Sequence, residues 1–304
     1  MGVIETTSLS KSYSNTTAVD GLDLSVEQGE VFGFLGPNGS GKSTTIDILL
    51  GFIQRTSGTA SVFGLDPAED GTSIRRNCGV VPDGFEVMPG WTGRDHLAFE
   101  LDARDVDSET TPLLDRVGLL EDADRPATGY SRGMTQRLLI AMACAGEPDV
   151  LLLDEPSTGL DPNGAQLLQE LVEEQTARGA TVFFSSHRLG QVESVCDRIG
   201  ILADGSLLTV DSIESLRETL SDAAQLRVSV DHVPNELEPL LNHNAVNGVE
   251  VDGCTLHIEC SVERQLAVLK QLEQLGVNPR EFETETASLQ DVFAAYTTSA
   301  AAES

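Results

Sequence analysis

The sequence predicts an α/β fold with a mainly parallel sheet, followed by a small α+β domain. Between Val3 and about Asp211, short β-rich runs alternate with helical stretches, which is typical of α/β domains. Three of these runs are mainly apolar: Val31 to Leu35, Val150 to Leu153 and Thr181 to Ser185. Because helices normally cover both faces of a parallel sheet, strands of this composition indicate the sheet of one large domain, residues 1–215.

A helical insertion is predicted inside this first domain, at about residues 83–146. This stretch is rich in Arg, Asp and Leu and has few strand signals, although strands resume on either side of it. The insertion therefore interrupts the sheet-forming sequence without ending the domain.

Residues 216–304 follow a second pattern, in which strands and helices alternate in the order βαββαβ. The expected elements are a strand at Gln225–Val230, a helix near Asn235–Leu241, two strands joined by Asp252-Gly253, a helix from Val262 to Leu272, a strand at Glu281–Glu285 and a closing helix at Ser288–Tyr296. This order predicts a small ferredoxin-like domain.

The chain is strongly acidic. Its net charge is −30 and its isoelectric point about 4.2, a balance that repels nucleic acid, so we expect no nucleic-acid partner. Because carboxylates run through both halves of the chain, we interpret the charge as an adaptation to a salt-rich, halophilic cytoplasm, where short Debye lengths screen self-repulsion.

The cysteines and the apolar runs indicate the cellular compartment of the chain. The five cysteines are scattered and are not spaced as zinc ligands, which favours a reducing cytoplasm. No apolar run approaches the roughly 20 residues of a membrane helix, so the chain is not expected to cross a bilayer.

A glycine-rich motif follows the first apolar strand. Residues 36–43 fit the pattern G-x-x-x-x-G-K-[ST] and precede a helical run, which is the context this motif requires. Backbone N–H groups and the helix N-terminus can then face the phosphates of ATP, while Lys42 bridges them and Ser43 binds Mg²⁺. The predicted ATP contacts are Gly36, Pro37, Asn38, Gly39, Ser40, Gly41, Lys42, Ser43 and Thr44.

Two carboxylates, Asp154 and Glu155, end the apolar strand that begins at Val150. A buried strand does not normally end in this way without a cation or a proton to manage. Asp154 is therefore predicted to hold Mg²⁺ and Glu155 to polarise the attacking water. These two motifs alone fit many phosphate-loop enzymes, small-molecule kinases among them.

The residues between the two motifs reduce the number of phosphate-loop families that fit the sequence. Tyr130-Ser131-Arg132-Gly133-Met134-Thr135-Gln136-Arg137 lies shortly before the Asp154 strand. With the motifs in this order, the sequence resembles the nucleotide-binding subunit of ABC transporters, whose signature is L-S-G-G-Q. Ser131 and Gly133 match that signature, whereas Tyr130, Arg132 and Met134 follow a variant familiar from exporters. The resemblance implies that the signature of one subunit covers the γ-phosphate bound on another, and so implies a dimer.

The same resemblance assigns three more residues. Ser157-Thr158-Gly159-Leu160-Asp161 looks like the D-loop of the family, which crosses the dimer interface. His187 matches the family's switch histidine, which senses the γ-phosphate. Tyr13 lies where the family stacks an aromatic ring on adenine. We interpret the other histidines as structural.

Asp83 departs from the family pattern. Where the glutamine of the Q-loop usually follows the strand before the helical insertion, this chain has Val80-Val81-Pro82-Asp83. Aspartate is charged and one methylene shorter than glutamine. Contact with Mg²⁺ through water and a structural role in the loop therefore both stay open.

The resemblance implies an ATPase subunit that pairs with a second copy of itself or with a homologous ATPase subunit. The dimer would dock through residues 83–121 on an integral membrane permease, would lie on the cytoplasmic face of the membrane, and would move the permease as it closes on ATP. The ending at residues 288–293, Ser-Leu-Gln-Asp-Val-Phe, resembles exporter-type subunits of the ABC type 2 group and favours export. A soluble ABC ATPase acting on ribosomes or nucleic acid, a nucleotide sensor and a phosphotransferase are the alternatives, and the sequence does not specify the transported substrate.

Overall fold

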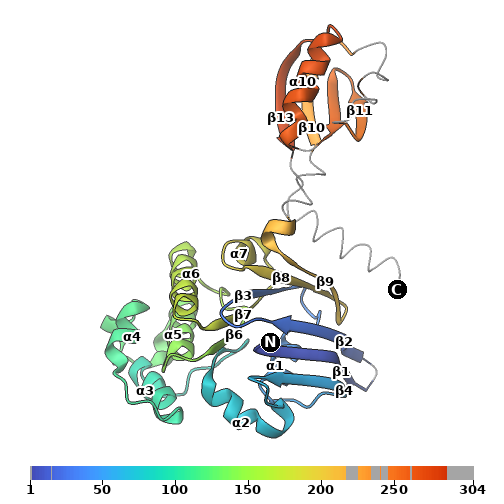
Figure 1. Ribbon diagram of the computed structural model, residues 1–304. Helices are drawn as coiled ribbons and strands as arrows, with labels where there is room; N and C mark the ends of the chain where they lie inside the picture. The colour runs from blue at the N-terminus through green and yellow to red at the C-terminus, as the bar shows by residue number, and fades with distance from the viewer. Residues whose placement is uncertain are drawn as a thin grey trace. The chain divides into compact units, whose positions relative to one another are not determined.

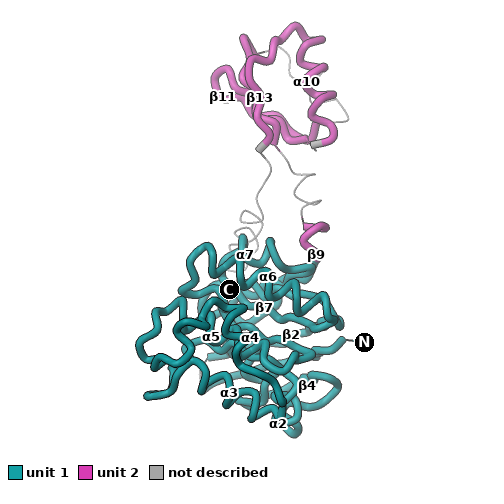
Figure 2. Tube along the Cα trace, turned by 90° about the vertical axis from the view of Figure 1, so that its left-hand side faces the viewer, with its two compact units in different colours: residues 1–211 teal, residues 212–304 magenta. Residues whose placement is uncertain are grey.

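The structure is a computed structural model that describes residues 2–14, 16–216, 225–233, 240, 246–260 and 262–285. The chain divides into two compact units, residues 1–211 and residues 212–304, shown in different colours in Figure 2. Each unit has its own hydrophobic core. Among the described residues, no helix combines the length and the apolar character that crossing a bilayer requires.

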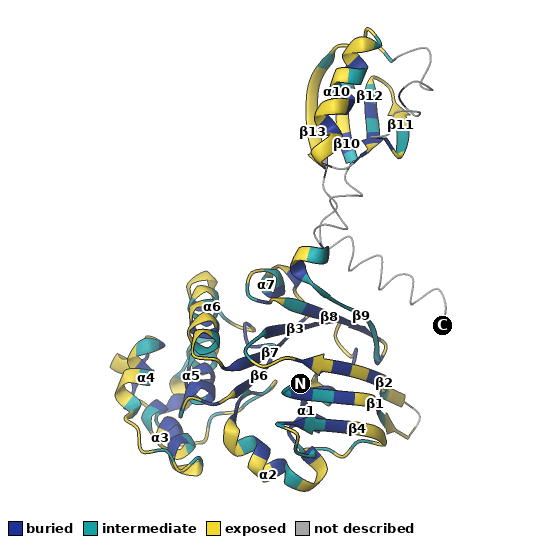
Figure 3. Cartoon of the chain, in the orientation of Figure 1, coloured by how far each residue is buried: buried dark blue, intermediate teal, exposed yellow. Residues whose placement is uncertain are grey.

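The main sheet of the first unit has the strand order β5-β6-β7-β3-β8-β9. Its pairs β5/β6, β6/β7, β7/β3 and β3/β8 are parallel, so the predicted α/β class is confirmed. Every residue of β3, β6 and β7 is buried, as their apolar sequences require (Figure 3). The strands are β3 Val31–Leu35, β5 Cys78–Val81, β6 Val150–Asp154, β7 Thr181–Ser186, β8 Arg198–Ala203 and β9 Ser206–Ser212.

A second, antiparallel sheet with the order β2-β1-β4 was not predicted from the sequence. Its strands are β1 Ile4–Tyr13, β2 Thr16–Val26 and β4 Ser57–Val62. In β2, Val19, Leu22, Leu24 and Val26 are buried among exposed polar residues, which is the pattern of a strand with one covered face. Helix α1, Lys42–Leu49, packs between the two sheets, because it contacts β2, β4 and β6.

The predicted helical insertion lies between β5 and β6 and contains α3 Gly93–Ala103, α4 Thr110–Arg116, η1 Leu120–Asp122, η2 Ala127–Gly129 and α5 Arg132–Cys144. These helices gather at one side of the main sheet, and α5 contacts β5 (Figure 1). Three other helices complete the unit: α2 Pro67–Asn77, α6 Pro162–Ala177 and α7 Leu189–Glu193.

The second unit contains an antiparallel sheet with the order β11-β12-β10-β13. Strand β12 lies between β10 and β11, which is the split arrangement of a ferredoxin-like domain. Its elements are β10 Gln225–Val230, β11 Gly248–Asp252, β12 Thr255–Glu259, η3 Val262–Arg264, α10 Gln265–Gln274 and β13 Pro279–Glu285. Of the predicted helix near 235–241 only the buried Leu240 is described, and the predicted closing helix at 288–296 lies outside the described residues.

Candidate nucleotide site

The glycine-rich loop connects β3 to α1, as the motif requires. It turns through Gly39 and Gly41, whose φ angles of 84° and 106° are in the left-handed region. A Cβ on Gly41 would lie 2.2 Å from the carbonyl oxygen of Ala18, and one on Gly36 would lie 2.4 Å from that of Leu202. The loop therefore runs so close to the backbone of β2 and β8 that only glycine fits at these two positions.

A cleft of about 270 Å³ opens in front of this loop. Six of the nine predicted loop residues line it, and so do Asp83 and Glu155, which come from the far ends of β5 and β6. The carboxyl ends of parallel strands meet at one edge of a sheet, which explains why residues so distant in sequence share the cleft. The lining residues are Ala18, Asn38, Gly39, Gly41, Lys42, Ser43, Thr44, Asp83 and Glu155.

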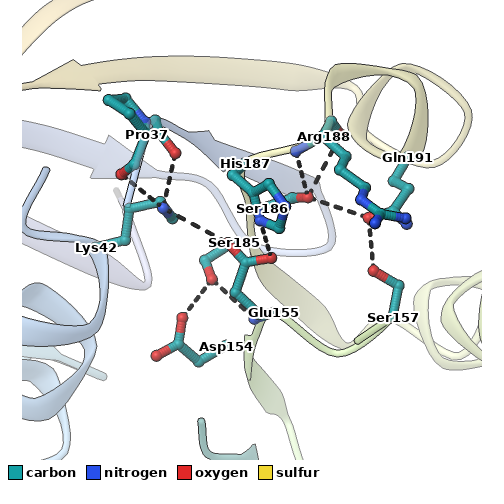
Figure 4. A network of polar contacts seen from close by, with 11 residues as sticks. Pro37, Lys42, Asp154, Glu155, Ser157, Ser185, Ser186, His187, Arg188 and Gln191 are labelled. Atoms are coloured by element: carbon teal, nitrogen blue, oxygen red, sulfur yellow. Dashed lines mark hydrogen bonds and ion pairs between the residues drawn. The ribbon is translucent and has the colours of Figure 1, made fainter. Parts of the chain in front are cut away.

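Lys42 is the cation of this cleft and is only 5% exposed. Its Nζ donates to the carbonyl oxygens of Gly36, at 2.7 Å, and Pro37, at 3.2 Å. It also lies 3.5 Å from Glu155 Oε1 (Figure 4). A buried ammonium group is stable only when acceptors surround it, and here the loop itself supplies them.

Glu155 is held in a constrained position at the end of β6. Its φ of 48° is in the left-handed region, and its backbone N–H donates to Ser185 Oγ at 3.0 Å. One carboxylate oxygen, Oε2, lies 2.8 Å from Nδ1 of His187. Among the described residues, no donor makes a hydrogen bond to the buried Oε1. That oxygen is therefore oriented by the fold and is able to accept a hydrogen bond from a ligand or water.

Asp154 is 4% exposed and its Oδ1 accepts a hydrogen bond of 2.5 Å from Ser185 Oγ. Its charge acts on a second carboxylate: burial, and then repulsion from Asp154, raise the pKa of Asp47 in α1. A bound cation would relieve the repulsion between these two neighbouring carboxylates.

Sequence reasoning missed the hydroxyl and amide groups that support the carboxylates. Ser185 joins Asp154 to the backbone of Glu155, and Gln191 Oε1 accepts from Ser157 Oγ at 2.5 Å and from Ser186 Oγ at 3.1 Å. These contacts connect the start of the D-loop to the end of β7, as Figure 4 shows. The sequence feature that could have indicated these groups is the pair of consecutive serines, Ser185 and Ser186, at the end of a buried strand.

The other predicted residues lie outside this cleft. Ser131 is the N-cap of α5 and accepts a hydrogen bond from the backbone N–H of Met134. Arg132 lines a separate cleft together with Asp154 and Glu155, and a Cβ on Gly133 would lie 3.2 Å from the carbonyl oxygen of Gly159. Asp161 is the N-cap of α6.

Tyr13 stands at the end of β1 and is 47% exposed. The ammonium group of Lys11 lies 4.7 Å from the centre of its ring and also donates to the carbonyl oxygen of Gln54 at 2.7 Å. Tyr13 therefore has surface available for stacking, but it is not among the residues that line the cleft.

The residues in and beside the cleft fit Mg²⁺ bound together with ATP, although Asp154 lines the neighbouring cleft that contains Arg132 and not this one. Among the described residues, no group of three or more His, Cys, Asp and Glu side chains could hold a metal ion by itself. Mg²⁺ usually takes only one or two protein ligands and completes its shell with phosphate oxygens and water. A hydroxyl from Ser43 and a carboxylate from Asp154 match that requirement, and the buried Oε1 of Glu155, which lies 3.5 Å from Lys42 Nζ but accepts no hydrogen bond from a described residue, leaves one acceptor for water.

A glycine loop before a helix, a buried lysine and two strand-end carboxylates define a nucleoside-triphosphate-binding domain of the phosphate-loop class. The family described as ABC transporter matches residues 19–158. The daunorubicin/doxorubicin resistance ATP-binding protein of Streptomyces peucetius is 35% identical, over 97% of this chain and 92% of that protein. The linearmycin resistance ATP-binding protein of Bacillus subtilis is 30% identical, over 89% of each chain.

Solved structures agree with these relatives. A structure described as the ATP-binding subunit of an ABC transporter has a TM-score of 0.67 and 29% identity, and the match covers 71% of this chain and 92% of that one. The chain therefore belongs to the ATP-binding, ATP-hydrolysing subunits of ABC transporters.

Proposed function

We propose that two copies of this chain, or one copy and a homologous subunit, close around Mg-ATP and drive a separate permease that exports its substrate. The observation that carries the proposal is the contact of Glu155 with both Lys42 and His187: Oε1 lies 3.5 Å from the ammonium group of Lys42, which lines the cleft together with Glu155, and Oε2 lies 2.8 Å from Nδ1 of His187. A binding site without turnover has no need of a carboxylate oriented in this way.

Each residue of the cleft then has a separate task. Backbone N–H groups of residues 38–44 and the ammonium of Lys42 bind the β- and γ-phosphates, exchanging the carbonyl contacts of Lys42 for phosphate oxygens. Glu155 accepts a hydrogen bond from the attacking water and orients it toward the γ-phosphate. His187 fixes the orientation of Glu155 through Oε2 and, being partly exposed, can also reach the γ-phosphate.

Ser43 and Asp154 would hold Mg²⁺, and Asp83, which lines the same cleft as Ser43, would contact it through water. When bound, the ion neutralises charge on the phosphates. Ser185 keeps Asp154 in place by donating to its Oδ1, so that the carboxylate enters the site in one orientation.

The dimer is supported by the placement of the signature. Ser131 begins an α-helix of 13 residues, is exposed, and lies outside the cleft that its own chain forms around the phosphate loop. A helix N-terminus of this kind is suited to the γ-phosphate bound on a second subunit. Ser131, Arg132, Gly133, Met134 and Asp161 would complete that second site, and Tyr13 would stack on adenine.

Export is supported by the relatives that match along most of the chain, since two are named as resistance proteins and another as a bacitracin transport protein of Bacillus licheniformis. The permease would dock on the helical insertion at residues 83–121 and hold the dimer at the cytoplasmic face of the membrane. The net charge of −30 supports a halophilic setting in which salt screens the surface.

The test is the variant Glu155→Gln, which keeps the shape of the side chain but removes its negative charge. We expect ATP to bind normally, turnover to fall by at least a hundredfold, and a stable dimer to appear in size-exclusion chromatography with Mg-ATP in high salt. Glu173→Gln, an exposed carboxylate on α6, is the matched control and should behave as wild type. Normal hydrolysis by Glu155→Gln would show that the assigned role is wrong.

A further inference from the structure

His96 lies in the first turns of α3, is 2% exposed, and uses both ring nitrogens in hydrogen bonds. Nδ1 lies 2.7 Å from the carbonyl oxygen of Thr92, which can only accept, so Nδ1 carries the proton. Nε2 accepts a hydrogen bond of 2.9 Å from the backbone N–H of Met88. The two contacts together require a neutral ring with its proton on Nδ1.

Through Nε2, His96 holds the segment that leads from the nucleotide cleft to the helical insertion. This segment begins at Asp83, which lines the cleft, and ends at Trp91, just before α3. Phe85 and Trp91 approach the imidazole in edge-on geometry, with ring centroids 6.3 Å and 5.4 Å away. The segment therefore wraps around the His96 ring, with the Met88 hydrogen bond between the two aromatic contacts.

The start of α3 is attached in turn to the residues that lead into the signature. The backbone N–H of Ala127 donates to the carbonyl oxygen of Trp91 at 2.7 Å, and that of Arg94 donates to Ala123 at 3.0 Å. Tyr130, which immediately precedes Ser131, donates its hydroxyl to the carbonyl oxygen of Asp122 at 2.8 Å.

The Tyr130 ring also packs against Gly93, so closely that a Cβ on Gly93 would lie 2.4 Å from the tyrosine oxygen. Tyr130, which stands where the family signature has leucine, therefore packs against Gly93 at the start of α3. Backbone and side-chain contacts join the signature turn to the helix that carries His96.

We propose that His96 is a positioning residue that fixes the Asp83 segment to the part of the helical insertion carrying the signature turn. A displacement at Asp83 is then transmitted to Ser131, because the hydrogen bond from Met88 to His96 closes the connection between them. This inference rests on the proposed function, in which Asp83 faces one nucleotide and Ser131 another.

A matched pair of substitutions separates the two roles. His96→Gln places an amide oxygen at about the reach of Nε2 and can still accept from Met88. His96→Asn is one methylene shorter and can replace only the Nδ1 donor. We expect the backbone N–H groups of Met88 and Trp91, which both donate hydrogen bonds in this segment, to exchange with solvent at least tenfold faster in His96→Asn than in wild type, while His96→Gln stays within about threefold.

Trp91 is the only tryptophan of the chain, so its fluorescence reports on this segment directly. Adding Mg-ATP to the full chain in high salt should change Trp91 emission in wild type and in His96→Gln, and the change should fall by more than half in His96→Asn. ATPase turnover should decrease in the same variant with little change in KM, because ATP binding uses the phosphate loop.

A third variant, Met88→Pro, removes the donor and leaves the ring intact. Met88 precedes Pro89, which already restricts Met88 to extended backbone, and its side chain is 51% exposed, so proline is tolerated there. Met88→Pro should reproduce the fluorescence and turnover effects of His96→Asn.

The proposal is overturned if His96→Gln behaves as His96→Asn does, or if exchange accelerates in His96→Asn and Met88→Pro while their Mg-ATP response and turnover stay as in wild type. Asp83→Ala tests the underlying function separately. Unchanged turnover in that variant would remove the role of Asp83 but leave the exchange results for His96 intact.

Discussion

Replacing Gly41 by alanine is the sharpest test of the phosphate loop. Gly41 has a φ of 106°, a conformation that costs an alanine about 1–2 kcal/mol. The added Cβ would also lie 2.2 Å from the carbonyl oxygen of Ala18, whereas an ordinary contact begins at 3.4 Å. Either the loop or β2 must therefore retreat by roughly 1 Å.

The displacement, rather than the strain, should dominate the loss of function. The N–H groups proposed to bind the phosphates belong to the same turn, and a misplacement of about 1 Å in an active site can cost on the order of 100-fold in rate. We therefore expect the Kd for ATP to rise about 100-fold, equivalent to about 2.7 kcal/mol. The free energy of unfolding should fall by a further 1–2 kcal/mol.

Gly64→Ala is the matched control, because Gly64 also has a left-handed φ, of 74°, but no atom within 4 Å of its added Cβ. Both variants should lose similar stability from backbone strain in urea unfolding. Only Gly41→Ala should lose ATP affinity, measured by titration calorimetry with Mg-ATP in molar KCl. Wild-type affinity in Gly41→Ala would refute the close approach of loop and strand.

The remaining predictions concern stability. Phe183→Ala should lower the free energy of unfolding of the first unit by about 3–5 kcal/mol in urea titrations, because this buried ring packs between Phe32 and Phe34 with centroids 5.7 Å and 5.1 Å away; a loss under about 1 kcal/mol would contradict that packing. Asp66 caps α2 and forms two hydrogen bonds to Arg55, so Asp66→Asn, which keeps a capping oxygen, should stay about 1 kcal/mol more stable than Asp66→Ala in thermal unfolding. The hydrogen bond from Arg55 holds the pKa of Asp66 below its usual value of 3.8. The ionised Asp66 carboxylate therefore contributes fully to the free energy of unfolding above pH 3.8, and this contribution is lost as the pH falls through the lower pKa of the folded state. Asp66→Asn should abolish this part of the dependence of stability on acid. Finally, stability should rise from dilute buffer to molar KCl if the charge of −30 is an adaptation to salt, and equal stability would exclude it.

Much of the nucleotide site could be predicted because its parts are local in sequence. The phosphate loop occupies consecutive residues and needs glycine at fixed positions. Asp154 and Glu155 can be recognised because they are two carboxylates at the end of a buried strand. Ser185, Gln191 and His96 could not be found in this way. Each acts through a hydrogen bond to a residue on another element, and serine, glutamine and histidine are common in positions with no such partner.

The antiparallel sheet was missed for a different reason. Its strands β1 and β4 pair across an intervening chain, residues 14–56, that includes β2, β3 and α1. The alternation of apolar residues in β2 can be recognised in the sequence, but an alternation with a period of two residues predicts only that one face of the strand is covered. The partner and the face it covers depend on contacts between distant segments.

The sequence by itself determined the chemistry of this protein, since the spacing of glycine, lysine and serine and the two strand-end carboxylates specify a phosphate-binding loop and its acidic partners. Only the tertiary structure decided how those groups are oriented: the parallel sheet places Glu155 beside Lys42 and His187, and His96 of α3 accepts a hydrogen bond from Met88 in the segment that begins at Asp83. The physical reason is that the residue types which bind phosphate are fixed by charge and backbone geometry over a few residues, whereas the direction of a carboxylate or an imidazole is set by hydrogen bonds that only folding brings within reach.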